Sequence, residues 1–310
     1  MSQSVPAFID LQVNGHGGVD LLSVSDSEEI RKLSRSLLKE GVGAYQPTLI
    51  TGPISQTLRV MKLIEEVRRA PRDDESEILG IHLEGPFLSP ARAGTHPKEY
   101  LEFPTQELLG RYLASGTVTM LTLAPELPGG LEAIKFLTKM GVIVSLGHSD
   151  ATLEQARAGF EAGASTVTHL WNAMDKNPLL GIAAAALERE EVAIQLIVDG
   201  VHLTDEQILY TVQRAPNRFI LTNDAVAAAG LGDGIYPFGS FEIEVKAGRA
   251  TRSDGVLAGG VGDLKSSLAR LLALGVEFDS ALASVTSRPA HLIGRPELGQ
   301  MSLGGRTTLI

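Results

Sequence analysis

Short apolar runs rich in β-branched residues alternate along the chain with longer stretches in which apolar residues recur at helical spacing. The apolar runs predict eight β-strands, at residues 7–13, 42–50, 78–84, 118–124, 142–148, 165–170, 193–199 and 218–224. The amphipathic stretches between them, such as 27–41 and 152–164, predict helices. Thr152 is followed three residues later by Gln155, which is the spacing of a capping box.

Strands that alternate with helices predict a parallel sheet, and eight such strands close a (β/α)₈ TIM barrel. A doubly wound open sheet is the alternative fold, and it favours a glycine-rich phosphate turn after the first strand. The residues at that place, NGHGG (14–18), contain no G-x-G-x-x-G pattern. The pattern therefore favours the barrel.

The pattern changes after residue 224. Residues 234–260 alternate apolar and polar positions around KAGR, which predicts a β-hairpin inserted between the eighth strand and its helix. Residues 263–275 and 279–294 then predict the closing helices. No interdomain linker is evident, so residues 1–310 are expected to form a single (β/α)₈ domain.

Composition and charge narrow the classes of function. The chain has 310 residues, no cysteine and a net charge of −10 without a long Lys/Arg cluster. This argues against nucleic acid or an anionic membrane as the main partner, and it excludes disulfides and thiolate metal sites. The amino terminus lacks the features of a signal peptide, and no apolar run reaches the roughly 18 residues that span a bilayer. We therefore expect a cytoplasmic protein.

Ionisable and amide residues gather where the predicted strands end, and a barrel brings the carboxyl ends of its strands to one mouth. These residues are Gln12, Asn14, Glu84, His148, His169, Asp199, His202 and Asp224. Within the group, Glu84, His148 and His169 form a His₂Glu set that leaves a fourth position for water, as in many catalytic zinc sites. A divalent cation would also stabilise an ionised Glu84 at the end of the apolar run ILGIHLE.

Other polar and aromatic residues near these positions favour structural roles. His82 points to the same side of its strand as Glu84, one layer deeper, and is interpreted as a hydrogen-bonded core residue. His291 lies on a late predicted helix and is also interpreted as structural. Trp171 is expected to pack in the wall of the site, and Asp199 either caps a helix or belongs to the site.

Seven motifs occur in the order found in N-acetylglucosamine-6-phosphate deacetylases, which belong to the amidohydrolase superfamily. The motifs are FIDLQVNGHGGVD (8–20), HLEGPFLSPARAGTHP (82–97), GHSDAT (147–152), THLWNAM (168–174), DGVHL (199–203), TNDAVAAAGLGDG (222–234) and LAGG (257–260). The chain resembles this family over nearly its whole length. The resemblance implies a distorted (β/α)₈ barrel, hydrolysis of the acetamide of N-acetylglucosamine 6-phosphate, and a homodimer.

The resemblance also implies roles for individual residues. Glu84, His148 and His169 match the metal ligands, Asp224 matches the catalytic acid/base, and His96 matches the histidine that polarises the amide carbonyl. The matches to substrate contacts are Thr95, Asn172, Ala173, His202, Leu257, Ala258 and Gly259.

The amides Gln12 and Asn14 stand where many superfamily members have a His-x-His pair that holds a second metal. Amides are poorer ligands for zinc than imidazole is, which indicates one divalent ion. Zinc is the expected ion, with iron, cobalt or manganese as alternatives.

Two departures from the family pattern affect the expected function. Members usually carry a phosphate-gripping Arg shortly after the triplet Asn172-Ala173-Met174, but this chain has only Lys176 there. The family's small β-domain is expected to be largely missing, with residues 298–310 as its candidate remnant. The substrate therefore stays open between the phosphorylated sugar and another N-acyl amino sugar or N-acyl amine. A barrel that binds a sugar phosphate without catalysis is the contrasting hypothesis.

Overall fold

The computed structural model describes residues 3–301 and 305–310, and these residues form a (β/α)₈ barrel, as predicted. Each barrel strand pairs in parallel with the next. In order, the strands are β2 (Phe8–Val13), β5 (Val42–Ile50), β7 (Ile81–Glu84), β8 (Val118–Leu123), β9 (Ile143–Leu146), β10 (Thr166–Val167), β11 (Ala193–Leu196) and β12 (Phe219–Leu221). The short strand β6 (Glu77–Ile78) pairs with β5 beside them.

The barrel closes between its first and last strands through the segment after β12. Ala225 forms parallel bridges to both Val13 and Gly260, and its carbonyl accepts the Asn14 N–H at 2.7 Å. A Cβ on Gly260 would lie 2.1 Å from the carbonyl oxygen of Asn223. Only glycine therefore permits this close approach of the two backbones.

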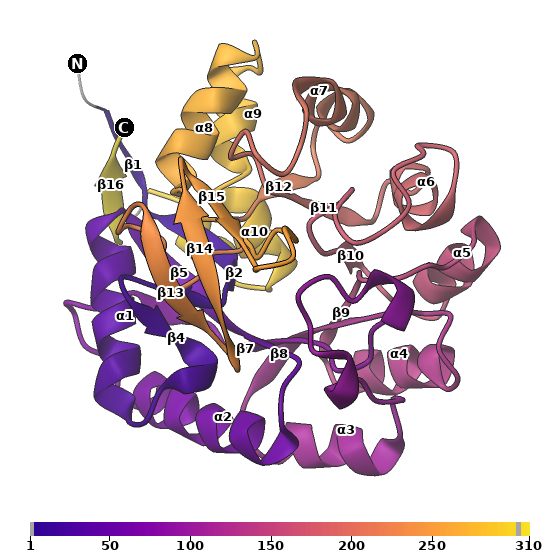
Figure 1. Cartoon of the computed structure of the whole chain (residues 1–310). Coiled ribbons are helices and arrows are strands. Elements are labelled where there is room, and N and C mark those ends of the chain that lie inside the picture. Colours follow the sequence, from indigo (N-terminus) through magenta and orange to yellow (C-terminus); the bar gives the residue numbers. More distant parts are fainter. Residues whose placement is uncertain (1–2, 302–304) are drawn as a thin grey trace.

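A ring of helices surrounds the strands (Figure 1). They are α1 (Ser27–Lys39), α2 (Ile54–Arg69), α3 (Gln106–Leu113), α4 (Gly130–Lys139), α5 (Leu153–Glu161), α6 (Gly181–Leu187), α7 (Asp205–Arg214), α8 (Leu264–Ala273), α9 (Phe278–Ala283) and α10 (Ser287–Leu292). Short elements lie in the loops: β3 (Gly15–His16), β4 (Val19–Asp20), η1 (Leu21–Ser23), η2 (Pro90–Arg92), η3 (Lys98–Tyr100) and η4 (Pro296–Gly299). In the described part of the chain, every helix is too short or too polar to cross a bilayer.

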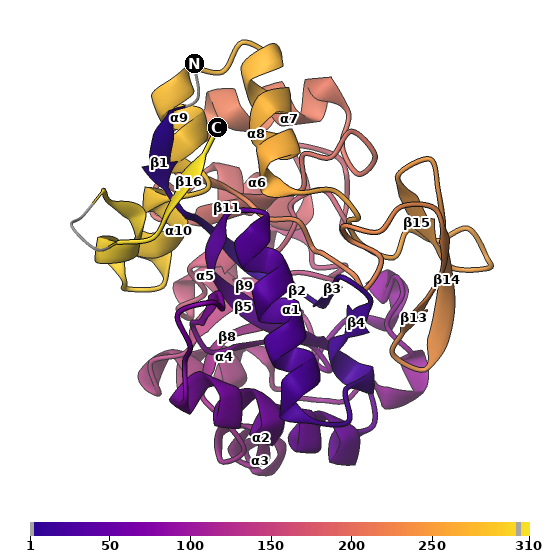
Figure 2. The ribbon, with the colours of Figure 1, turned by 90° about the vertical axis from the view of Figure 1, so that its left-hand side faces the viewer.

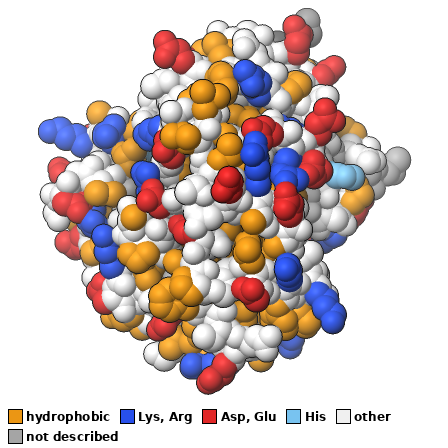
Figure 3. Space-filling view, turned by 90° about the vertical axis from the view of Figure 1, so that its right-hand side faces the viewer, with side chains coloured by type: hydrophobic (Ala, Val, Ile, Leu, Met, Phe, Trp, Pro, Cys, Tyr) orange, Lys and Arg blue, Asp and Glu red, His pale blue; other side chains and the backbone are white. Residues whose placement is uncertain are grey.

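Local sequence explains where these helices begin and which face they bury. The side chain of Thr152 caps α5 and forms the predicted capping box with Gln155. Helix α1 begins after the N-cap Asp26 and buries Ile30, Leu33 and Leu37 on one face. Acidic and basic side chains are interspersed on the face of the molecule that Figure 3 shows. The ion pair Arg157–Glu188 joins two exposed side chains.

The predicted helix 279–294 is wrong in one respect, because the structure divides it into α9 and α10. Pro289 lacks an N–H and is tolerated only in the first turn of a helix, so a new helix begins shortly before it. The break exposes the carbonyls of Ser284 and Val285, which accept the backbone N–H groups of Leu221 and Ile9. The break thus ties the closing helices to the last and first barrel strands.

Several strands are shorter than predicted, and the missing residues belong to the site. The predictions 142–148, 165–170, 193–199 and 218–224 become strands that end at residues 146, 167, 196 and 221. His148, His169 and Asp224 have φ angles of 48°, 32° and 51°, which a strand cannot include. The predicted strand 78–84 is likewise interrupted at Gly80, whose φ is 123°.

Among the described residues, three small sheets lie outside the barrel, and one of them is the short pair β3–β4. Residues 234–251 form the three antiparallel strands β13 (Gly234–Phe238), β14 (Phe241–Lys246) and β15 (Arg249–Thr251), one strand more than the predicted hairpin. Strand β1 (Ser4–Pro6) pairs with β16 (Thr307–Leu309), on the side of the barrel away from the β13–β15 sheet (Figure 2). Of the stretch 298–310, residues 302–304 lie outside the described residues, and its origin as a domain remnant stays a prediction.

Asp10 is a fully buried carboxylate on β2. It accepts a hydrogen bond from the Thr222 hydroxyl at 2.7 Å, but burial outweighs this and raises the pKa of Asp10 to about 6. Because the folded pKa lies above the unfolded one, this group costs stability as the pH rises from about 4 through 6.

We therefore expect Asp10→Asn to become more stable relative to the wild type as the pH rises from 5 to 8, by about 1–2 kcal/mol. An Asn Oδ1 can still accept the Thr222 hydroxyl. Urea unfolding of both proteins at the two pH values measures the change. A difference in unfolding free energy that does not vary with pH would contradict the assignment.

Candidate active site

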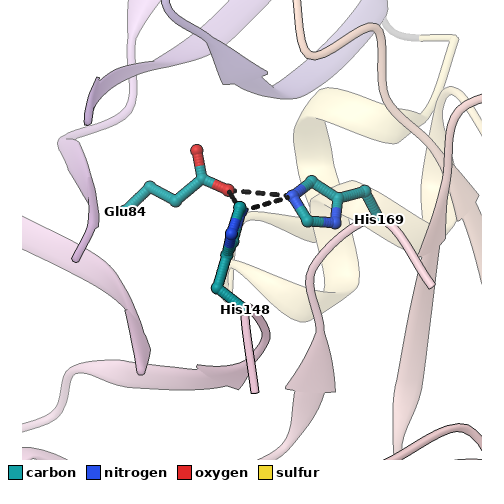
Figure 4. Close-up of side chains that lie close together, drawn as sticks. All are labelled: Glu84, His148 and His169. Atoms are coloured by element: carbon teal, nitrogen blue, oxygen red, sulfur yellow. Dashed lines mark hydrogen bonds and ion pairs between the residues drawn. The ribbon is translucent and has the colours of Figure 1, made fainter. Parts of the chain in front are cut away.

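Glu84, His148 and His169 come together at the carboxyl ends of three barrel strands (Figure 4). Glu84 Oε1 lies 3.1 Å from His148 Nε2 and 2.9 Å from His169 Nε2. The two imidazole nitrogens are 3.1 Å apart. All three side chains are buried. The three predicted metal ligands therefore lie together, and each offers one ligand atom to the same small space.

The hydrogen bonds around this cluster favour a cation at that point. His148 Nδ1 lies 2.9 Å from the backbone carbonyl of Arg92 and donates its proton there. Its Nε2 therefore presents a lone pair to Glu84 and His169, as metal-binding imidazoles do. Donor atoms about 3 Å apart match the spacing around one small cation. The residues present thus fit a divalent ion with an open position.

When no cation is bound, the two imidazoles themselves supply the positive charge that keeps Glu84 ionised. Burial raises the pKa of Glu84, but the two imidazoles outweigh burial and hold it well below its usual range. Gln12 Nε2 donates a further hydrogen bond to Glu84 Oε1 at 3.0 Å. Glu84 is therefore an anion, and Gln12 supports it as a hydrogen-bond donor.

Strained backbone conformations cluster at the site. His148, His169, Trp171, Ala173 and Asp224 all have positive φ, although none is glycine. Each such conformation costs of the order of 1–3 kcal/mol, and the surrounding structure must offset it. His148, His169, Ala173 and Asp224 line one cavity, so four of the five strained residues lie at the site itself.

Asp224 lies in the same cavity, held by one amide. Asn14 Nδ2 donates to Asp224 Oδ1 at 2.7 Å, which leaves Oδ2 without that partner. Burial, and then the charge of Glu84, raise the pKa of Asp224 to about 7. A cation bound to Glu84 would offset the second cause and leave the effect of burial. The carboxylate is suited to accept and return a proton.

His96 is a neutral imidazole with a defined tautomer. Its Nδ1 accepts the backbone N–H of Thr51 at 3.2 Å, so the ring proton is on Nε2. Burial, followed by the charge of His148, lowers the pKa of His96 to about 3. Nε2 lies 3.8 Å from Glu84 Oε2, on the side of the ligand cluster. His96 can therefore donate a hydrogen bond beside the cluster.

A cavity of about 230 Å³ joins these groups. Every residue that the resemblance assigns to substrate binding lines it: Thr95, Asn172, Ala173, His202, Leu257, Ala258 and Gly259. Asn14 also lines it, whereas Gln12 lies behind Glu84 and is fully buried. Among the described residues, Lys176 is the one Lys or Arg in the lining.

The remaining candidates divide between the cavity and the core. Asp199 does not cap helix α7, whose N-cap is Thr204; instead it accepts His202 Nδ1–H at 2.7 Å and orients that ring. His82 is fully buried and bonded to the Thr122 hydroxyl at 2.7 Å, as the structural interpretation predicts. Trp171 packs in the wall, and its Nε1 donates to Thr211 on α7 at 2.8 Å.

Thr51 and Phe238 also belong to the site, although neither was predicted from the sequence. Thr51 directly follows the second predicted strand, and this position at a strand end could have marked it as a site residue. In the structure it contacts His96. Phe238 lines the cavity from the tip of the β13–β14 hairpin. No sequence pattern marks Phe238, because its place depends on how the inserted sheet packs over the barrel mouth.

Comparison with known proteins identifies relatives of the whole chain. A family model described as the amidohydrolase family matches residues 4–308. N-acetylglucosamine-6-phosphate deacetylase from Bos taurus is 33% identical over 93% of this chain and 74% of its own length. N-acetylgalactosamine-6-phosphate deacetylase from Escherichia coli is 33% identical over 98% of this chain and 82% of its own length.

Solved structures agree with these sequence relatives. N-acetylglucosamine-6-phosphate deacetylase from Pasteurella multocida superposes with a TM-score of 0.92 at 30% identity, covering 99% of this chain and 82% of its own. An aspartate-to-alanine mutant of the Mycobacterium smegmatis enzyme, in complex with N-acetyl-D-glucosamine 6-phosphate, superposes with a TM-score of 0.91 at 33% identity, covering 100% of this chain and 83% of its own.

Proposed function

Because this chain belongs to the amidohydrolase family, we propose that it hydrolyses the acetamide of N-acetylglucosamine 6-phosphate to glucosamine 6-phosphate and acetate. The observation that carries the proposal is the convergence of Glu84, His148 and His169 in the same cavity as Asp224 and His96. A protein that only binds a sugar phosphate needs neither a metal site nor a proton acceptor, so the arrangement favours a hydrolase.

We propose that Glu84, His148 and His169 hold one divalent cation. Zinc is the proposed ion because a His₂Glu set with an open position is common in zinc hydrolases; iron, cobalt and manganese accept the same donors. When bound, such an ion supplies Lewis acidity, which polarises a carbonyl oxygen and makes a neighbouring water more acidic.

The chain's own residues supply the proton transfers. Asp224 takes a proton from the attacking water through the carboxylate oxygen that Asn14 does not hold. It then returns the proton to the departing amine, so that the C–N bond breaks to give acetate and the amino sugar. His96 donates its Nε2–H to the carbonyl oxygen as negative charge develops there. Such donors commonly contribute about 3–4 kcal/mol to transition-state stabilisation.

The substrate's phosphate needs a cationic or hydrogen-bonding partner in the cavity. We propose that Lys176 and His202, which both line the cavity, face that end of the substrate. Lys176 acts as a point charge and lacks the fork of an arginine. The homodimer implied by the resemblance and the cytoplasmic location expected from the sequence also belong to this proposal, and light scattering tests the dimer.

Acetate release from a panel of sugars tests the proposed function. We expect N-acetylglucosamine 6-phosphate to be hydrolysed with a higher kcat/KM than unphosphorylated N-acetylglucosamine. N-acetylgalactosamine 6-phosphate belongs in the panel because one relative carries that activity in its name. Preference for the unphosphorylated sugar would show that the phosphate is not part of the recognised substrate.

Replacing Lys176 by Ala is expected to raise KM for the phosphorylated sugar about 3–10-fold with little change in kcat, because a uniform ground-state contact is lost. KM for the unphosphorylated sugar should stay constant. Lys139→Ala, at the exposed end of α4, is the matched control. Equal effects of Lys176→Ala on both sugars would remove Lys176 from phosphate binding.

A further inference from the structure

We propose that Glu126 is a positioning residue whose carboxylate fixes the turn at Ser149–Asp150 and thereby holds His148 in its ligand geometry. The inference rests on the metal site proposed above and adds a residue that sets its affinity. Glu126 follows strand β8, three residues after the strand ends. It is not among the residues that line the catalytic cavity, so any effect on the reaction passes through another residue.

Both oxygens of the Glu126 carboxylate bind the turn. Oε2 accepts the Ser149 hydroxyl at 2.7 Å, and Oε1 accepts the Asp150 backbone N–H at 2.7 Å. Ser149 is buried, and its own Oγ accepts the Ala151 N–H at 3.1 Å. Hydrogen bonds to a carboxylate are about twice as strong as neutral ones. Within residues 3–301 and 305–310 Glu126 forms no ion pair, so the turn is its main partner.

The turn that Glu126 holds begins at a strained residue. His148 has a φ of 48°, a conformation that costs about 1–3 kcal/mol unless its surroundings stabilise it. Its carbonyl accepts the Ser89 N–H at 2.9 Å, and its Nδ1–H donates to the Arg92 carbonyl at 2.9 Å. A shift of the turn would therefore rotate the imidazole away from the point that it shares with Glu84 and His169.

The same turn contacts Ala173, a residue that the resemblance assigns to substrate binding. The Ser149 N–H donates to the carbonyl of Ala173 at 3.2 Å, and Ala173 lines the cavity. Movement of the turn would consequently displace the cavity wall as well as the metal ligand. Loss of Glu126 is thus expected to change both metal affinity and KM.

A second side-chain contact to the turn is weaker. Arg92 pairs with Asp150 at 2.8 Å, but the two side chains are 34% and 53% exposed. Ion pairs this exposed contribute at most about 1 kcal/mol. Glu126, which bonds a buried hydroxyl and a backbone N–H, is therefore the stronger of the two side-chain contacts to the turn.

Zinc titration of the full-length protein, stripped of metal by a chelator, tests the inference. Glu126→Ala is expected to weaken zinc affinity about 10–100-fold, the usual effect of removing a group that orients a ligand. KM for N-acetylglucosamine 6-phosphate should rise as well. Glu126→Gln keeps an acceptor for the Asp150 N–H, and an affinity loss of about 3–10-fold is expected. Glu132→Ala, exposed on α4, is the matched control and should bind as the wild type does.

The outcomes separate the two proposals. A wild type that binds no zinc would overturn the metal site itself. A wild type that binds zinc, with Glu126→Ala of equal affinity, would overturn only the positioning role. If Glu126→Ala does not fold, Glu126→Gln decides the question, and an affinity equal to that of the wild type would reject the role.

Discussion

Asp224→Asn should lose turnover while the protein keeps its metal. The amide cannot accept the proton of the attacking water or return it to the departing amine, so kcat is expected to fall at least about 100–10,000-fold. Asn14 can still donate to the Oδ1 of the new side chain, so the cavity should keep its shape. Acetate release and metal content of the purified variant, measured together, give the two results.

The control for this variant is Asp279→Asn, on the exposed surface of α9, which should retain full activity. Two results would remove Asp224 from its assigned role. One is a variant that retains most of its activity. The other is a variant that loses its metal along with its activity, because Asp224 would then be a ligand and not the proton acceptor.

Glu84→Gln is expected to remove both the bound metal and the activity. Glu84 is the one anion of the ligand set, and its Oε1 lies near 3 Å from both imidazole nitrogens. A neutral amide is a poor ligand for zinc. We therefore expect metal affinity to fall more than about 100-fold. This loss is larger than the one expected when a residue that only orients a ligand is changed. Metal analysis after dialysis measures this loss.

His291→Ala provides the matched control, since His291 lies exposed at the end of α10, away from the ligand cluster. It should keep its metal and its rate. Retention of a full equivalent of metal by Glu84→Gln would contradict the ligand set and would require another anion in the site.

The fold could be predicted where a local pattern determines the structure. Strand β5 was predicted at its observed bounds. Its nine residues form one uninterrupted run, and all of them are buried in the wall of the barrel. The capping box of α5 followed from Thr152 and Gln155 alone. The division of 279–294 into two helices was missed because apolar spacing continues through the break, although Pro289 was visible in the sequence.

The candidate site could be predicted because barrel closure brings strand ends together. Glu84, His148 and His169 are far apart in sequence, and the eightfold alternation alone places their loops at one mouth. The predicted strands nevertheless extended too far, since the positive φ of His148 and His169 depends on contacts made by distant loops. Glu126 was not predicted for the same reason, because its partners Ser149 and Asp150 lie 23 and 24 residues further along the chain.

Anomalous X-ray diffraction at the zinc absorption edge, from crystals of zinc-loaded protein, would locate the divalent ion proposed between Glu84, His148 and His169. We expect a single strong anomalous peak within bonding distance of a Glu84 carboxylate oxygen and of the Nε2 atoms of His148 and His169. No peak between these atoms, or a strong peak held by other residues, would contradict the proposed metal site.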